Sequence, residues 1–136
     1  IGPARRSLIR KKREAYPGAP EEALTSFRVV SSAAGHSLVE AVPVTGRMHQ
    51  IRVHLRYAGH PITGDKLYGD DETVYLDYVN GGLTDSLTER AGFARCALHS
   101  RTIDFIHPFT GERVIIGSPL PDDMYELLSG FSLDLP

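Results

Sequence analysis

The chain has 136 residues, 41% of them hydrophobic and 24% charged, and its formal net charge is −2. This composition is that of an ordinary globular chain, and the length fits one domain. No apolar stretch approaches the roughly 20 residues of a membrane-spanning helix. No charged segment leads into an apolar one at the start of the chain, so we expect a cytoplasmic protein with no membrane partner. The single cysteine, Cys96, excludes an intrachain disulfide.

The first 20 residues form a strongly basic segment. Apart from the acid Glu14, its charged residues are all cations: Arg5, Arg6, Arg10, Lys11, Lys12 and Arg13. The segment ends in YPGAP, which can continue neither a helix nor a central strand. We therefore expect a basic arm or loop at residues 1–20, with an extended piece at residues 7–12, and a folded portion at residues 21–136. Such a basic stretch is more often a solvated face than a binding patch.

Four runs have the composition and alternation of β-strands. The first two, residues 24–32 and 36–44, are separated by a short turn, and they predict an antiparallel hairpin with Gly35 at positive φ. The other two, residues 97–106 and 112–117, flank a Pro- and Gly-containing turn and predict a second hairpin.

Residues 47–58 predict a helix between these hairpins. Gly59 is a typical residue just beyond a helix end, Pro61 prevents continuation, and Thr45 is the expected N-cap. On a helical wheel, one face is apolar and packs while another is cationic. These faces are formed by Ile51, Leu55 and Ala58, and by His49, Arg52 and Arg56, respectively.

Three further helices complete the expected elements. Short helices are predicted at residues 71–79 and 84–91, and a final helix at residues 122–129, where two acids follow a proline. Strand pairs joined as hairpins, with helices between and after them, indicate an α+β fold with mostly antiparallel sheet, a central amphipathic helix and a C-terminal helix.

Several kinds of catalytic site are disfavoured by spacing. His49 and His54 are five residues apart and do not share one helix face, whereas a helical zinc site needs a spacing of four with an intervening glutamate. The chain has no G-x-S-x-G element, no P-loop and no dinucleotide fingerprint. We therefore expect no metal and no cofactor, and a metal- or histidine-dependent hydrolase is a weak alternative.

The residues best suited to binding or catalysis are concentrated in the run VTGRMHQIRVHLRYAGHPITGDKLYG, residues 44–69. Backbone amides at Thr45 and Gly46 would suit an anion such as phosphate if they lie free at a helix N-terminus. The arginines that follow are fork-shaped donors for phosphate or carboxylate. The residues alone also fit an ordinary capped amphipathic helix with exposed arginines, and they favour this second interpretation.

This run closely resembles the signature of the RluA-type RNA pseudouridine synthases, in which T-G-R-x-H-Q-I-R-V-H leads to G-H-P-I-x-G-D-x-L-Y-G. The flanking sequences EEALTSFRVV, SLVEAVPVTGR, RCALHSRTIDFIHPFTGERV and SPLPDDMYELL extend the likeness over residues 21–130. The resemblance implies an isomerase that converts uridine to pseudouridine in RNA without metal or cofactor. Ribosomal RNA is the commoner substrate of this family, and transfer RNA the next.

The resemblance also implies roles for individual residues. Arg52 would pair with the catalytic aspartate, and Leu98 would line the pocket under the target base. Arg47, His49 and Arg56 would contact RNA phosphates or hold local structure. A second set matches pattern positions that hold the turn after the helix: His60, Asp65 and Tyr68.

The chain departs from the family at one important point. The catalytic aspartate of the family lies in an upstream H-R-L-D-x-x-T-S-G block, and no such block occurs here. Since the first residue is Ile1 and not Met, we expect the C-terminal part of a catalytic domain, inactive alone, whose partner is the N-terminal half of the same domain. The alternative is a non-catalytic RNA-binding module that uses the cationic helix 47–58.

Overall fold

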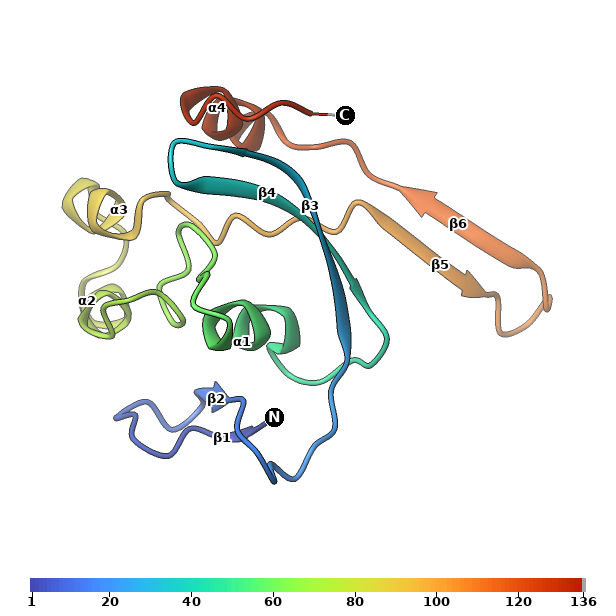
Figure 1. Ribbon diagram of the computed structural model, residues 1–136, viewed down its shortest axis with the longest axis horizontal. Helices are drawn as coiled ribbons and strands as arrows, with labels where there is room; N and C mark the ends of the chain where they lie inside the picture. Colours follow the sequence, from blue (N-terminus) through green and yellow to red (C-terminus); the bar gives the residue numbers. More distant parts are fainter. Residues whose placement is uncertain (136) are drawn as a thin grey trace.

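The computed structural model describes residues 1–135, which form an α+β fold as the sequence predicts. The sheets of the described chain are three separate antiparallel pairs, β1–β2, β3–β4 and β5–β6. In Figure 1, α1 lies at the centre, between the β1–β2 pair and the long β3–β4 hairpin. The elements are β1 (Gly2–Pro3), β2 (Arg13–Glu14), β3 (Thr25–Ala33), β4 (His36–Pro43), α1 (Gln50–Tyr57), α2 (Thr73–Gly81), α3 (Asp85–Ala91), β5 (Thr102–Ile106), β6 (Arg113–Gly117) and α4 (Asp122–Gly130).

The β3–β4 hairpin has the expected position and turn. Ala34 and Gly35 connect the strands with φ of 50° and 77°, the pair of positive values that a two-residue turn between right-twisted strands needs. The pairing runs from Ala33 opposite His36 to Thr25 opposite Pro43 and slips between Val29 and Ser31. The end of β4 leads into the loop that precedes α1.

The β5–β6 hairpin projects from the body of the molecule (Figure 1). Ile103 lies opposite Ile116, and Phe105 opposite Val114. Because side chains alternate between the faces of a strand, these four share one face. Ile103 and Ile116 are each 53% exposed, so the hairpin has an apolar face without a covering layer among residues 1–135.

The basic N-terminal segment is docked onto the core. Ile1 and Ile9 are buried in a cluster with Val53 of α1, Leu67 and Tyr68. The extended pieces lie at β1 and β2, at either end of a turn, and not at residues 7–12 as the sequence suggested. Burial of the two isoleucines explains the difference, since it folds the segment back on itself and holds it against α1.

The helices at residues 71–79, 84–91 and 122–129 are confirmed with small shifts in their ends, as α2, α3 and α4. The α4 end of the chain packs on the β3–β4 turn, where the Phe131 ring stacks on the His36 ring at 3.6 Å. The Asp134 amide donates to Ser31 Oγ at 3.2 Å. Among the described residues, no helix has both the length and the apolarity to cross a bilayer.

Gly64 lies where two loops touch, and we expect Gly64→Ala to be strongly destabilising. Its φ is +75°, and an added Cβ would lie 1.9 Å from the carbonyl oxygen of Arg95. Gly111 is the control, since its φ is +72° and its added Cβ would meet nothing within 4 Å. Urea denaturation should give a loss of roughly 2–5 kcal/mol for Gly64→Ala, from backbone strain and overpacking together. Gly111→Ala should lose about 1–2 kcal/mol, from backbone strain alone, and equal losses would contradict the close approach.

Candidate active site

The loop before α1 is organised by one buried glutamine. Gln50, which is 4% exposed, accepts hydrogen bonds from Thr45 Oγ1 at 2.6 Å and from the Arg47 amide at 3.0 Å. Its side-chain amide donates to Leu24 O and Thr25 Oγ1, both at 2.9 Å. The side chain is therefore fully hydrogen-bonded and ties the loop to the start of β3, as a buried amide requires.

This arrangement corrects the expected start of the helix. The helix begins at Gln50, not at residue 47, and the preceding residue is His49 at φ 60° and ψ 19°. Thr45 is not the N-cap, because its hydroxyl bonds Gln50 and accepts from the Leu24 amide. The Arg47 amide is also taken up by Gln50. Of the two amides expected to bind an anion, that of Thr45 donates to Leu24 O at 3.4 Å, and neither lies at the N-terminus of the helix.

The predicted packing face of α1 is also wrong. Its buried residues are Gln50 and Val53, while Ile51 and Leu55 are half-buried and Ala58 is exposed. The helix is covered by the β3–β4 hairpin on one side and by the N-terminal segment on another, so its burial does not follow a single apolar stripe.

Arg52 of α1 forms a two-pronged ion pair with Asp65. Arg52 Nε and Nη2 donate to the two carboxylate oxygens of Asp65, each at 2.7 Å. The Asp65 side chain is completely buried, and the Arg52 side chain is 23% exposed. The same carboxylate accepts from the amides of Leu67 and Tyr68, at 3.0 and 2.9 Å. Asp65 therefore both closes the turn after the helix and fixes the guanidinium.

The pKa values of this pair follow from its geometry. Burial alone would raise the pKa of Asp65, but the hydrogen bonds from Arg52 and from two backbone amides outweigh it, so the pKa lies below the ordinary value. Burial would lower the pKa of Arg52, yet bonding and attraction to Asp65 raise it. Burial, with the charge of Asp65, raises the pKa of the neighbouring Cys96 thiol to about 12. Cys96 is therefore protonated at neutral pH and is not a nucleophile.

Backbone contacts between two loops bring Leu98 close to α1. The Gly64 amide donates to Ala91 O at 2.9 Å, and the Ala97 amide donates to Thr63 O at 2.9 Å. Leu98 then lines a cavity of about 210 Å³ at the start of α1, and Arg52 lines the same cavity. The residue expected to pair with a catalytic aspartate and the residue expected to line the base pocket thus lie around one cavity. It is lined by Pro43, Thr45, Gly46, Arg47, His49, Gln50, Ile51, Arg52 and Leu98.

His49 lines this cavity and is held by Tyr68. Tyr68 is 1% exposed, and its hydroxyl accepts from the Arg13 amide at 3.0 Å and lies 2.8 Å from His49 Nδ1. The Tyr68 hydroxyl therefore links the N-terminal segment to the His49 ring and holds that ring in place. Burial and the charge of Arg52 lower the pKa of His49, which favours the neutral ring.

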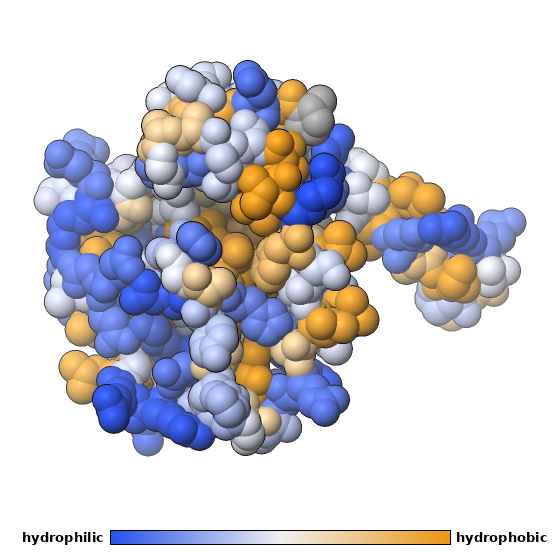
Figure 2. All heavy atoms as spheres, in the orientation of Figure 1, coloured by the Kyte–Doolittle hydropathy of each residue, from blue (hydrophilic) through white to orange (hydrophobic). Residues whose placement is uncertain are grey.

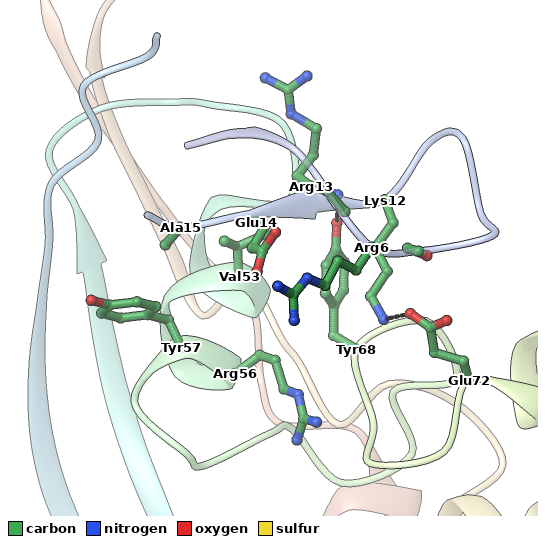
Figure 3. Close-up of a pocket in the computed structure, with 12 residues that line it drawn as sticks. Arg6, Lys12, Arg13, Glu14, Ala15, Val53, Arg56, Tyr57, Tyr68 and Glu72 are labelled. Carbon is green, nitrogen blue, oxygen red and sulfur yellow. Dashed lines mark hydrogen bonds and ion pairs between the residues drawn. The ribbon is translucent and has the colours of Figure 1, made fainter. Parts of the chain in front are cut away.

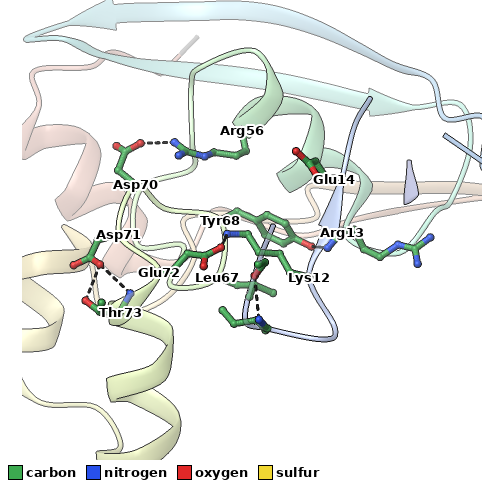
Figure 4. A network of polar contacts seen from close by, with 12 residues as sticks. Lys12, Arg13, Glu14, Arg56, Leu67, Tyr68, Asp70, Asp71, Glu72 and Thr73 are labelled. Atoms are coloured by element: carbon green, nitrogen blue, oxygen red, sulfur yellow. Dashed lines mark hydrogen bonds and ion pairs between the residues drawn. The ribbon is translucent and has the colours of Figure 1, made fainter. Parts of the chain in front are cut away.

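The other arginines of the run lie apart from this cavity or bond the protein itself. Arg47 lines the cavity, but its Nε donates to Glu22 O at 2.9 Å. Arg56 does not line this cavity and pairs with Asp70, as Figure 4 shows together with the Lys12–Glu72 pair beside Tyr68. The structure thus brings together Arg47, His49, Arg52 and Leu98, but not Arg56.

Two contributors were missed by sequence reasoning. Asp65 was identified as a turn residue but not as the partner of Arg52, because a loop residue thirteen positions away gives no helical spacing to read. Gln50 was passed over since a buried glutamine has no periodic signature. Both residues lie in the run of residues 44–69 and match positions of its family signature, which was the signal available in the sequence.

Comparisons with known proteins point to one family. The family model described as RNA pseudouridylate synthase matches residues 5–57. Ribosomal large subunit pseudouridine synthase D of Neisseria meningitidis serogroup A is 40% identical over 112 residues, which cover 82% of this chain and 28% of that protein. Ribosomal large subunit pseudouridine synthase C of Vibrio cholerae is 39% identical over 112 residues, covering 82% and 31%.

A solved structure agrees with the sequence relatives. The structure of human RNA pseudouridylate synthase domain containing 4 superposes with a TM-score of 0.63 at 29% identity, over 84% of this chain and 44% of that chain. The fold of this chain therefore corresponds to part of the fold of RNA pseudouridine synthases. The chain belongs to the RluA-type family of these proteins. It spans about a third or less of the length of the curated relatives described above.

Proposed function

We propose that this chain forms the C-terminal part of the catalytic domain of an RNA pseudouridine synthase that acts on ribosomal RNA in the cytoplasm. The observation that carries the proposal is the single cavity shared by Arg52 and Leu98, in a chain whose relatives are named ribosomal large subunit pseudouridine synthases. The target uridine would leave its stack and enter this cavity, at a cost of a few kcal/mol.

Arg52 is placed to hold a second carboxylate. Asp65 takes up Nε and Nη2, whereas Nη1 makes no hydrogen bond within residues 1–135. We propose that Nη1 pairs with the catalytic aspartate, which the upstream part of the domain would supply. A guanidinium beside a carboxylate keeps it ionised inside a protein. Asp65 would then be the residue that orients the guanidinium toward the cavity.

The reaction needs an ionised aspartate and a held base. The bond between N1 and C1′ breaks, the base turns, and C5 joins C1′, while C5 gives up its proton and N1 takes one up from solvent. Leu98 would pack under the base, and Arg47 and His49 would contact the nucleotide or its phosphate. No step calls for a metal or a cofactor.

The uncovered apolar face of β5–β6 is an argument that another part of the complete domain packs on this hairpin. Figure 2 shows hydrophobic side chains exposed on the surface of the projecting hairpin. An isolated two-stranded hairpin is only marginally stable in water, and an exposed apolar face favours association with another protein surface. The N-terminal half of the same domain is the partner that we propose for this face.

An RNA-binding module built on helix 47–58 is less well supported. Arg52 is bonded to Asp65, and Arg56 to Asp70. Arg47 donates Nε to a backbone carbonyl. These contacts leave the helix with less free positive charge than its sequence suggests.

Release of tritium from RNA labelled at C5 of uridine tests the proposal. We expect background counts for residues 1–136 alone, because no aspartate within residues 1–135 bonds Nη1 of Arg52. We expect turnover when the same chain is joined to its upstream sequence or mixed with it as a second polypeptide. Turnover by the chain alone would show that one of its own acids is catalytic, and none with the upstream part present would reject the synthase assignment.

A further inference from the structure

Unpaired positive charge is concentrated on the N-terminal segment and not on α1. The ion pairs within residues 1–135 include Arg52 and Arg56 of the helix, but none includes Arg6, Arg10 or Lys11. Arg6, Arg10 and Lys11 are also exposed. These three free cations lie on the turn between β1 and β2.

The turn that carries these cations is held in place. Ile1 and Ile9 are buried against the core. On either side of the tip, the Ala4 amide donates to Lys12 O at 3.0 Å, and Lys12 Nζ pairs with Glu72. A segment anchored in this way presents its charges in a fixed arrangement, which lowers the entropy cost of binding a charged partner.

A cavity of about 300 Å³ lies between this segment and α1. Figure 3 shows Arg6 entering it from the N-terminal segment and Arg56 from the helix, with Tyr57 at its edge. Tyr57 is 66% exposed, so a face of its ring is accessible. The acids of the cavity are Glu72, which is paired with Lys12, and Glu14, which accepts from the Arg5 amide at 3.1 Å.

We infer that this cavity and the basic turn beside it form a second RNA-contacting site, which binds a single-stranded stretch flanking the target nucleotide. The inference rests on the proposed function for its choice of RNA as the polymer. Arg6 and Arg10 contact phosphates through their guanidinium forks. The Tyr57 ring stacks on a base, which is the usual way in which proteins hold unpaired nucleotides.

The same cations could attract an anionic membrane surface, but the composition of the turn favours RNA. Membrane-surface segments combine basic residues with several large apolar side chains that enter the lipid. Leu8, 86% exposed, is the large hydrophobic that residues 1–20 present to solvent. An accessible aromatic ring beside arginines matches a nucleic-acid strand better than a bilayer.

Fluorescence anisotropy with a labelled oligouridylate of about 12 nucleotides tests the site in the whole chain. The test variant is Arg6→Ala/Arg10→Ala. The matched control is Arg28→Ala/Arg113→Ala, which removes the same charge from exposed residues that pair with Glu40 and Asp104 on two other hairpins. Tyr57→Ala and Tyr57→Phe probe the ring. Circular dichroism checks that each variant is folded.

Binding should weaken about ten-fold in the test double variant, and the slope of log affinity against log salt should fall by about 1.4, since each lost phosphate contact on a single strand contributes about 0.7. The control double variant should bind as the parent does. Tyr57→Ala should weaken binding without changing that slope, and Tyr57→Phe should not.

Equal losses in the two double variants would mean that only bulk charge matters and would overturn the site. Absence of oligouridylate binding, or stronger binding to vesicles of phosphatidylcholine and phosphatidylserine than to RNA, would overturn it too. None of these results would decide the synthase assignment, which the tritium-release assay tests independently. The failure of one proposal can therefore be distinguished from the failure of the other.

Discussion

Asp65→Asn is expected to destabilise the folded chain by about 3–5 kcal/mol, because it breaks a buried ion pair and leaves the Arg52 guanidinium without its counter-charge. The completely buried carboxylate accepts five hydrogen bonds, two from Arg52, two from backbone amides and one from the Cys96 thiol. Asp70→Asn is the control, because the Asp70 side chain in the pair with Arg56 is 82% exposed. Such a surface pair should contribute less than about 1 kcal/mol. Urea denaturation followed by circular dichroism measures the free energy of unfolding of both variants.

The pH dependence of stability provides a second readout of the same pair. The pKa of Asp65 is lower in the folded chain than in the unfolded chain, so its contribution is fully present above the unfolded pKa of about 3.9. It is lost as the pH falls through the lower folded pKa. The parent should therefore lose more stability than Asp65→Asn as the pH falls from about 5 through the unfolded pKa toward the lower folded pKa. Parallel curves for the two proteins would show that Asp65 is not ionised in the fold.

The local elements could be predicted because their signals lie within a few residues. The β3–β4 turn needs positive φ at two adjacent positions, and Gly35 supplies one of them at little cost. The strands predicted at residues 97–106 and 112–117 contain β5 and β6, although residues 97–101 are not part of the strand. These features depend on neighbours in sequence, which is why they are visible without a structure.

The N-terminal segment and the start of α1 could not be predicted in the same way. Ile1 and Ile9 looked like isolated hydrophobics in a basic arm, and only their contacts with Val53 and Tyr68 make them core residues. Thr45 fits an N-cap by type, but the buried Gln50 competes for its hydroxyl and for the following loop. In both cases a long-range contact overrides the local preference.

The site shows the same division between local and long-range information. Arg52 and Leu98 could be selected from the resemblance, and the structure places them around one cavity. The pairing of Arg52 with Asp65 depends on how the turn at residues 59–64 folds back on the helix, which no local pattern encodes. This contact has a practical consequence, because removal of the Arg52 side chain would strand a buried carboxylate as well as the proposed catalytic one.

Arg52→Lys is therefore the informative substitution for catalysis, and we expect it to lower kcat about 100-fold or more in the polypeptide that includes the upstream part of the domain. Lysine keeps a positive charge beside Asp65, which limits the damage to folding. An ammonium cannot reproduce a fork that bonds Asp65 through Nε and Nη2 while Nη1 meets a second carboxylate. Arg28→Lys is the control, since Arg28 pairs with Glu40 on the exposed β3–β4 hairpin.

The pH profile of kcat separates this electrostatic role from a general loss of structure. A well-placed guanidinium lowers the pKa of the catalytic aspartate, so the weaker contact in Arg52→Lys should raise that pKa and move the acid limb of the profile to higher pH. Raising the pH should then restore part of the lost rate in Arg52→Lys and none in a variant that is merely unfolded. An unchanged acid limb, with kcat reduced equally at every pH, would show that Arg52 holds the shape of the site and does not set the charge of the aspartate.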